Sequence, residues 1–246
     1  MILRRRLDVG DTHIEALLSE DVFHAVSEAV FEAREEIEGR IAEDPFFGIT
    51  YEPVEPSPND PRAVRDMCAA SVAAGVGPMA AVAGAIANAA VLAAVREGCR
   101  FAVIDNGGDI AYVADRHFTV GIHAGDSRFP GMALSVPPST EIRSICSSSG
   151  SIGHSVSLGG SRISTVISKD PALADAFATA LGNVSVSEDR ESLSAAVEGI
   201  SGRDGVEGCF TIFGDLFVSA GEIPEIVEVD STDVRCCCQN RFRVRF

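Results

Sequence analysis

An alanine-rich apolar run from Val76 to Val95 places the strongest constraint on how this chain folds. Two glycines, a proline and an asparagine interrupt it, so a buried core helix is favoured over a membrane span. Pro78 suits the first position of such a helix, which we expect to end near Arg96. Small side chains around most of its circumference allow a sheet, or a flat ligand, to approach its backbone closely. Tight helix–sheet packing is the simpler interpretation of this run taken alone.

Helical and strand-like segments are mixed along the rest of the chain. Hydrophobic periodicity predicts further helices at 21–41, 61–74, 171–181 and 188–200. Strand-like runs occur at 2–7, 12–18, 100–104, 110–113, 117–123, 132–136, 163–167, 208–213, 216–218 and 226–229. Because these do not alternate as regular strand–helix–strand units, the pattern predicts a single α+β domain.

The net charge of the chain limits the classes of partner that it could bind. A formal net charge of −16 over 246 residues argues against nucleic acid and anionic membranes as partners, since both attract positive surfaces. A small anionic ligand, held by backbone amides or a metal, remains compatible with it. Three arginines begin at Arg4, but the apolar segment of an export signal does not follow them. We therefore expect a cytoplasmic protein, and the sequence leaves its oligomeric state open.

Seven cysteines are present, and the first four lack the spacing of metal ligands. The remaining three, Cys236, Cys237 and Cys238, are adjacent and precede an arginine-rich end. Tight thiolate sites need spaced pairs that converge on one ion. A terminal strand or a frayed end is therefore favoured over a metal or redox site.

Three short motifs carry side chains suited to chemistry. The first is Asp105-Asn106-Gly107-Gly108-Asp109, between two strand-like runs. Its two glycines permit positive φ and close approach of a ligand to the backbone. The simpler interpretation is a hairpin turn.

The second motif is a serine- and glycine-rich segment, residues 147–153, which leads to a single histidine, His154. Its serines are able to donate hydrogen bonds to phosphate oxygens, or they mark a flexible loop. His154 is able to act as an acid, a base or a phosphate contact near neutral pH. A structural histidine is the alternative.

The third motif lies in the predicted helix from Pro171 to Leu181. Asp170 suits the N-cap of this helix. Asp175 and Thr179 are four residues apart and therefore neighbours on one face. A carboxylate and a hydroxyl among small residues leave room for Mg²⁺, which prefers oxygen ligands. From the spacing alone, a helical hydrogen bond beside an exposed acid is the simpler interpretation.

Taken together, the motifs resemble a known family. Six segments, in order, are similar to the UPF0280 proteins, relatives of the ApbE-type FAD:protein FMN transferases. They are residues 76–87, which include Gly-Pro-Met-Ala-Ala-Val-Ala-Gly, and residues 105–110, 122–125, 145–150, 153–157 and 173–180. The resemblance runs from about residue 5 to residue 185.

The resemblance implies an ApbE-like α+β fold, a single domain with mixed or antiparallel sheets and packed helices. We expect this domain over residues 1–230, followed by a Cys/Arg-rich tail over 231–246. The family implies Mg²⁺ on Asp175, Thr179 and a carbonyl near Val82, and a catalytic role for His154. We expect FAD to contact a set of residues from the two loops, namely Asn106, Gly107, Gly108, Asp109, Ser148, Ser149 and Gly150.

The sequence also departs from the transferases. They carry a Lys-Gly pair and an aspartate in the small-residue helix, where this chain has Ala83-Gly84 and Asn88. Two hypotheses follow. One is a magnesium-dependent, FAD-binding enzyme that transfers FMN to a threonine or serine of an acceptor protein. The other is a non-catalytic flavin or nucleotide carrier.

Overall fold

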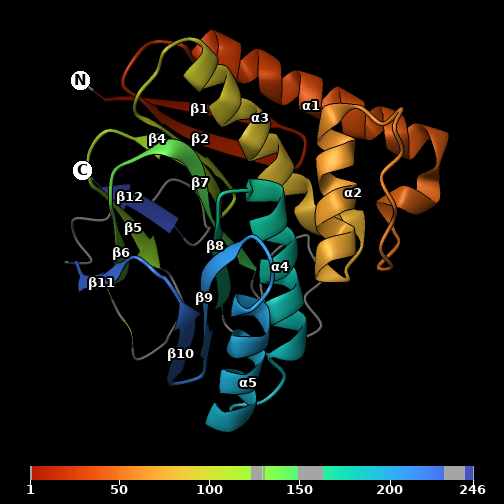
Figure 1. Ribbon diagram of the computed structural model, residues 1–246. Coiled ribbons are helices and arrows are strands. Elements are labelled where there is room, and N and C mark those ends of the chain that lie inside the picture. The colour runs from red at the N-terminus through yellow and green to blue at the C-terminus, as the bar shows by residue number, and fades with distance from the viewer. Residues whose placement is uncertain (1, 123–128, 130, 149–162, 230–241, 246) are drawn as a thin grey trace.

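The computed structural model describes residues 2–122, 129, 131–148, 163–229 and 242–245 (Figure 1). Its centre is an eight-stranded sheet in which all neighbouring strands are antiparallel. In spatial order the strands are β1 (Leu3–Val9), β2 (Thr12–Leu18), β3 (Ala102–Asn106), β4 (Asp109–Ala114), β7 (Ser139–Ser148), β8 (Ile163–Ser168), β9 (Val206–Phe213) and β10 (Leu216–Gly221).

A smaller, four-stranded antiparallel sheet packs beside the large one. Its order is β11 (Glu225–Glu228), β6 (Met132–Val136), β5 (Phe118–Ile122) and β12 (Phe242–Arg245). The last of these strands, β12, lies within residues 231–246, which were expected to form a tail. It pairs with β5 along residues 242–245. Cys236, Cys237 and Cys238 lie outside the described residues.

Helices cover the opposite face of the large sheet, so the molecule has three layers (Figure 1). They are α1 (Phe23–Glu43), α2 (Arg62–Ala74), α3 (Val82–Arg96), α4 (Pro171–Val184) and α5 (Arg190–Ser201), with two short 3-10 turns, η1 (Pro45–Gly48) and η2 (Pro78–Ala81). Strand residues alternate between the two cores, as the period of two in a strand requires. Ile104 and Cys146 face the helices, whereas Val103 and Ile145 face the small sheet.

The alanine-rich run forms η2 and α3, as expected. Within the described part of the chain, Pro78–Arg96 is the one helix long and apolar enough to cross a membrane. It packs against α1, α4, β3 and β4, and Ala87, Ala90 and Val91 are fully buried in the helix-side core. Its apolar composition is thus explained by its position between helices and sheet.

The α+β fold class is confirmed, and most strands lie within a few residues of their predicted positions. The exception is β7, the longest strand, for which the sequence showed no strand signal. Its sequence, STEIRSICSS, is rich in serine and charge, and such residues are weak strand formers. Strands on both sides, β4 and β8, hold it in the sheet. Pairing therefore overrides local preference here.

Candidate functional site

The glycine turn joins β3 to β4 and brings two polar side chains together. Asn106 pairs with Asp109 across the hairpin, leaving Gly107 and Gly108 as a two-residue loop with φ of 69° and 111°. These left-handed values favour glycine. The main-chain N–H of Gly108 donates to Asp105 Oδ1 at 2.8 Å. The hairpin interpretation is therefore correct, and it leaves Asn106 and Asp109 buried beneath the helices.

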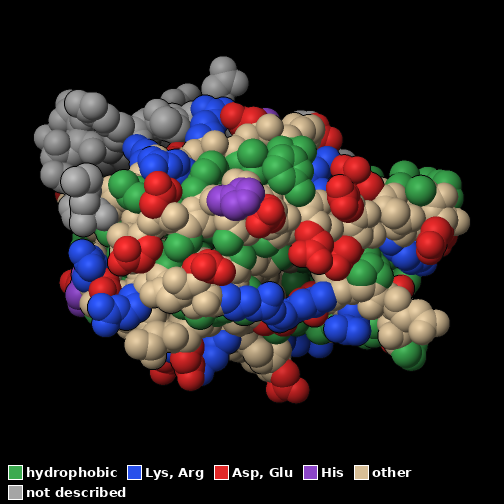
Figure 2. Space-filling model, turned by 90° about the horizontal axis from the view of Figure 1, so that it is seen from above, with side chains coloured by type: hydrophobic (Ala, Val, Ile, Leu, Met, Phe, Trp, Pro, Cys, Tyr) green, Lys and Arg blue, Asp and Glu red, His purple; other side chains and the backbone are tan. Residues whose placement is uncertain are grey.

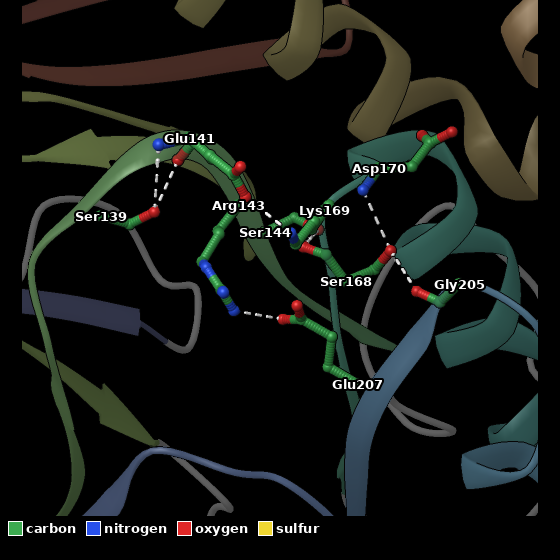
Figure 3. Close-up of polar contacts among 9 residues, drawn as sticks. All are labelled: Ser139, Glu141, Arg143, Ser144, Ser168, Lys169, Asp170, Gly205 and Glu207. Carbon is green, nitrogen blue, oxygen red and sulfur yellow. Dashed lines mark hydrogen bonds and ion pairs between the residues drawn. The ribbon is translucent and has the colours of Figure 1, made fainter.

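Polar contacts around the β8–α4 connection fix where α4 begins (Figure 3). Ser144 Oγ donates to the carbonyl of Ser168 at 2.9 Å, and Ser168 Oγ donates to the carbonyl of Gly205 at 2.7 Å. The same Ser168 oxygen accepts from the N–H of Asp170 at 3.0 Å. Asp170 then caps α4, as predicted, by accepting from Ala172 and Leu173.

With α4 placed in this way, Asp175 and Thr179 lie inside the molecule. Their exposed fractions are 8% and 6%, so the alternative of an exposed acid is wrong. Asp175 Oδ2 accepts a hydrogen bond of 2.9 Å from the main-chain N–H of Gly84. Gly84 lies in the first turn of α3, where N–H groups lack acceptors within the helix. Asp175 therefore supplies an acceptor to α3 from another helix.

Gly84 makes this contact possible, and the sequence did not single it out as a site residue. A β-carbon at this position would lie 2.2 Å from the carbonyl oxygen of Pro171 and 2.9 Å from Cβ of Asp175. Only glycine lets α3 and α4 approach so closely. A signal was present: a glycine within an alanine-rich helix is a weaker helix former than its neighbours and calls for a packing explanation.

Two further hydrogen bonds connect the β3–β4 turn and β7 to the contact between α3 and α4, and this region is called the junction below. Asn106 Nδ2 donates to the carbonyl of Ala83 at 3.1 Å, and the N–H of Ser147 donates to Asp109 Oδ1 at 3.2 Å. Asp109 pairs in register with Cys146 of β7, whose thiol contacts the Pro171 carbonyl at 3.5 Å. The structure thus brings together four of the predicted residues from two segments far apart in sequence, the β3–β4 hairpin and α4: Asn106, Asp109, Asp175 and Thr179.

The electrostatics of the junction are unusual. Burial raises the pKa of Asp175 well above its ordinary value, and the nearby charge of Asp109 raises it further. The N–H groups of Gly84 and Ala83 act in the opposite direction but do not compensate. Burial also raises the pKa of the Cys146 thiol, which makes a thiolate nucleophile there unfavourable. Two buried carboxylates that oppose each other's ionisation are well suited to a cation.

The residues present fit Mg²⁺. Within the described ranges, no three His, Cys, Asp or Glu side chains are grouped as a metal site. A cation here would therefore depend on carboxylate, hydroxyl and carbonyl oxygens together with water or ligand oxygens. Mg²⁺ is bound in this way, through one or two carboxylates and substrate phosphates. Asp175 and Thr179 supply the carboxylate and the hydroxyl, and Val82 lies at the start of α3 beside Gly84.

The serine segment is divided by the structure. Ser147 and Ser148 are the last residues of β7 and are buried, not part of a loop. Ser147 Oγ bonds to Thr165 Oγ1 at 2.7 Å, but the buried Ser148 Oγ has no hydrogen-bond partner among the residues that the structure describes. A buried hydroxyl without a partner is costly and suggests a bound group. Ser149, Gly150 and His154 lie outside the described residues.

Asp105 beneath the glycine turn provides a test of the turn's electrostatics. Burial raises its pKa to about 6, although the Gly108 N–H lowers it. Because the folded state holds this proton more tightly than the unfolded chain, the free energy of unfolding should fall as the pH rises from about 4 to 6, by at most ~3 kcal/mol. Asp105→Asn should remove this component, as urea unfolding at pH 4.5 and 7.5 would measure. Equal pH dependence in both proteins would contradict it.

Comparison with known proteins agrees with the features described above. A family model described as AbpE bacteria matches residues 4–197. A UPF0280 protein of Methanospirillum hungatei is 42% identical over 233 residues, covering 94% of this chain and 93% of its own. A UPF0280 protein of Methanothrix thermoacetophila is 46% identical over 209 residues, covering 85% and 87%.

Two solved structures share the fold. The apo form of the flavinyl transferase ApbE of Pseudomonas stutzeri superposes with a TM-score of 0.58 at 11% identity, covering 89% of this chain and 94% of that one. The flavin transferase ApbE of Vibrio cholerae gives 0.54 at 11% identity, covering 89% and 96%. The expected family and the ApbE-like fold are thus both confirmed, and this chain belongs to the UPF0280 family.

Proposed function

We propose that this protein binds FAD together with Mg²⁺ in the cytoplasm and transfers the FMN half to a threonine or serine of an acceptor protein. The junction of α3, α4 and the β3–β4 turn is the proposed site. Asp175 and Thr179 hold the metal with a carbonyl near Val82. Asn106, Gly107, Gly108 and Asp109 line the flavin nucleotide from the sheet. Ser148 contacts it from the end of β7, and Ser149 and Gly150, which follow in the sequence, are further proposed contacts.

One observation carries the proposal: Asp175 is buried, opposed by Asp109, and yet held by the Gly84 N–H. Burial of such a carboxylate in the absence of a cation costs free energy. Carboxylates with strongly shifted pKa values cluster at functional sites. The ApbE transferases, which share the fold, act on flavin, and their names suggest the class of ligand.

In the proposed reaction, the hydroxyl oxygen of the acceptor attacks the phosphorus that carries the riboflavin half of FAD. The bond from that phosphorus to the bridging oxygen breaks, AMP leaves, and FMN remains attached through a phosphoester. The hydroxyl proton passes to a base, for which His154 is our candidate. Mg²⁺ would neutralise the charge that develops on the pyrophosphate. Asp109 and Asp175 repel free anions, so binding of the nucleotide should require the metal.

A second candidate is a flavin or nucleotide carrier without catalysis. It is favoured by Ala83, which precedes Gly84 where the transferases have a lysine. Without a cation there, charge on the leaving phosphate has one stabilising partner fewer. The two candidates share the binding site and differ only in turnover.

Purified protein mixed with FAD and MgCl₂ separates the candidates. We expect FAD binding by fluorescence quenching and its reversal with EDTA. We also expect release of AMP, measured by chromatography, as FMN is transferred to water or to an acceptor hydroxyl. Thr179→Val removes one metal contact and should weaken Mg²⁺ binding at least ~10-fold. Thr119→Val, in the small sheet, is the matched control and should change nothing. Binding without AMP release would favour the carrier, and absence of any flavin or nucleotide binding would exclude both.

A further inference from the structure

We propose that Asn106 is a positioning residue, which holds Asp175 in place through a single peptide group of α3. Asn106 Nδ2 donates to the carbonyl of Ala83 at 3.1 Å. Asp175 Oδ2 accepts from the N–H of Gly84 at 2.9 Å. The carbonyl of Ala83 and the N–H of Gly84 belong to the same peptide unit. That peptide unit is therefore hydrogen-bonded at both ends, to the sheet through Asn106 and to α4 through Asp175.

Because the peptide bond is planar, the hydrogen bond at one end of the unit affects the hydrogen bond at the other end. In a trans peptide the C=O and N–H vectors point in opposite directions and cannot rotate independently. A donor at the oxygen therefore sets the direction of the N–H, and it also polarises the group so that the N–H becomes a better donor. Asn106 thus orients Asp175 indirectly, because it binds the opposite edge of the same planar peptide group.

The environment favours this role for Asn106. Its side chain is 6% exposed, and it is the final residue of β3, held in register opposite Ile14 and Asp109. Gly107 and Gly108 then turn the chain, so the amide is presented from a fixed hairpin end. An aliphatic side chain of the same size would fill the space but leave the Ala83 carbonyl without this donor.

The consequence for metal binding rests on the proposed function, whereas the consequence for the peptide group does not. When Asn106 is replaced by leucine, the Ala83–Gly84 peptide loses its outer hydrogen bond. The N–H of Gly84 then binds Asp175 less tightly, and the carboxylate is less well oriented. Weaker Mg²⁺ binding should follow, by about 10-fold, the lower end of the effect of residues that orient metal ligands.

Two measurements on Asn106→Leu test the inference. Residue-resolved amide exchange should show the Gly84 N–H exchanging at least ~10-fold faster than in the unaltered protein. Calorimetric titration with MgCl₂ should show the weakened affinity. Ser71→Ala is the control, because Ser71 Oγ bonds the Val76 carbonyl at 2.6 Å within a different part of the fold. It should lower stability while leaving both readouts unchanged.

The outcomes separate the inference from the proposed function. Unchanged Gly84 exchange in Asn106→Leu overturns the inference even if the protein binds Mg²⁺ and FAD. Faster exchange supports it even if the unaltered protein binds no Mg²⁺, in which case only the proposed function fails. If the leucine variant does not fold, Asn106→Ala takes its place. Rapid exchange of the Gly84 N–H in the unaltered protein would also overturn the inference, since this N–H would then not be held by Asp175.

Discussion

Gly84→Ala should destabilise the protein by about 3 kcal/mol, the upper end of the usual cost of inserting a methyl group into a packed interior. The new β-carbon would meet the Pro171 carbonyl oxygen at 2.2 Å and Cβ of Asp175 at 2.9 Å. Both belong to the α4 scaffold, so no rotation of a flexible side chain relieves the clash. Helices α3 and α4 would have to separate, breaking the bond between Gly84 and Asp175. Metal binding should be lost together with stability.

A matched substitution isolates this effect. Gly199 lies in α5, is exposed, and has open space where a β-carbon would be placed. Alanine is the better helix former, so Gly199→Ala should stabilise the protein by about 0.5–1 kcal/mol. The same change in two helices is thus expected to act with opposite sign. Urea denaturation of both variants measures the difference, and a Gly84→Ala protein as stable as the unaltered one would contradict the packing described.

Asp175→Asn should abolish Mg²⁺-dependent activity and yet stabilise the protein. Burial and Asp109 raise the pKa of Asp175, so its ionisation near neutral pH costs folding free energy. Asparagine is neutral and keeps an oxygen to accept from Gly84. The gain should be about 1 kcal/mol, typical of a substitution that trades function for stability.

The pH dependence of that gain follows from the sign of the shift. Since the folded state binds this proton more tightly, the unaltered protein should gain stability as the pH falls from the raised pKa of Asp175 in the folded state towards the ordinary carboxyl pKa of the unfolded chain. The asparagine variant should lack that component. Added MgCl₂ should raise the unfolding temperature of the unaltered protein alone. Asn183→Asp, which adds a carboxylate at the end of α4, is a control for a general effect of charge. A destabilised Asp175→Asn protein would indicate a purely structural carboxylate.

Local signals in the sequence were sufficient for much of the molecule. The hairpin of β1 and β2, the β3–β4 turn with its paired glycines, and the Asp170 cap of α4 follow from short-range preferences. The spacing of Asp175 and Thr179 on one face is likewise a property of any α-helix. These features need no knowledge of distant parts of the chain.

Other features depended on contacts between distant segments. β7 is a strand because β4 and β8 pair with it, despite a serine-rich sequence. Asp175 is buried because α4 packs against α2, α3, β7 and β8, whereas spacing alone favoured an exposed acid. His154, Ser149 and Gly150 stay predictions from the resemblance.

The alanine-rich run shows which features local sequence determines and which features depend on tertiary structure. Its composition determined that a helix with small side chains would be buried, because apolar surface is removed from water wherever the chain allows. Which elements approach it was decided only by tertiary structure. Gly84 and Asp175 are 91 positions apart, and no local preference relates them to each other or to Ala83 and Asn106. They meet because two helices and a hairpin pack at one point, where a single glycine leaves room for a carboxylate.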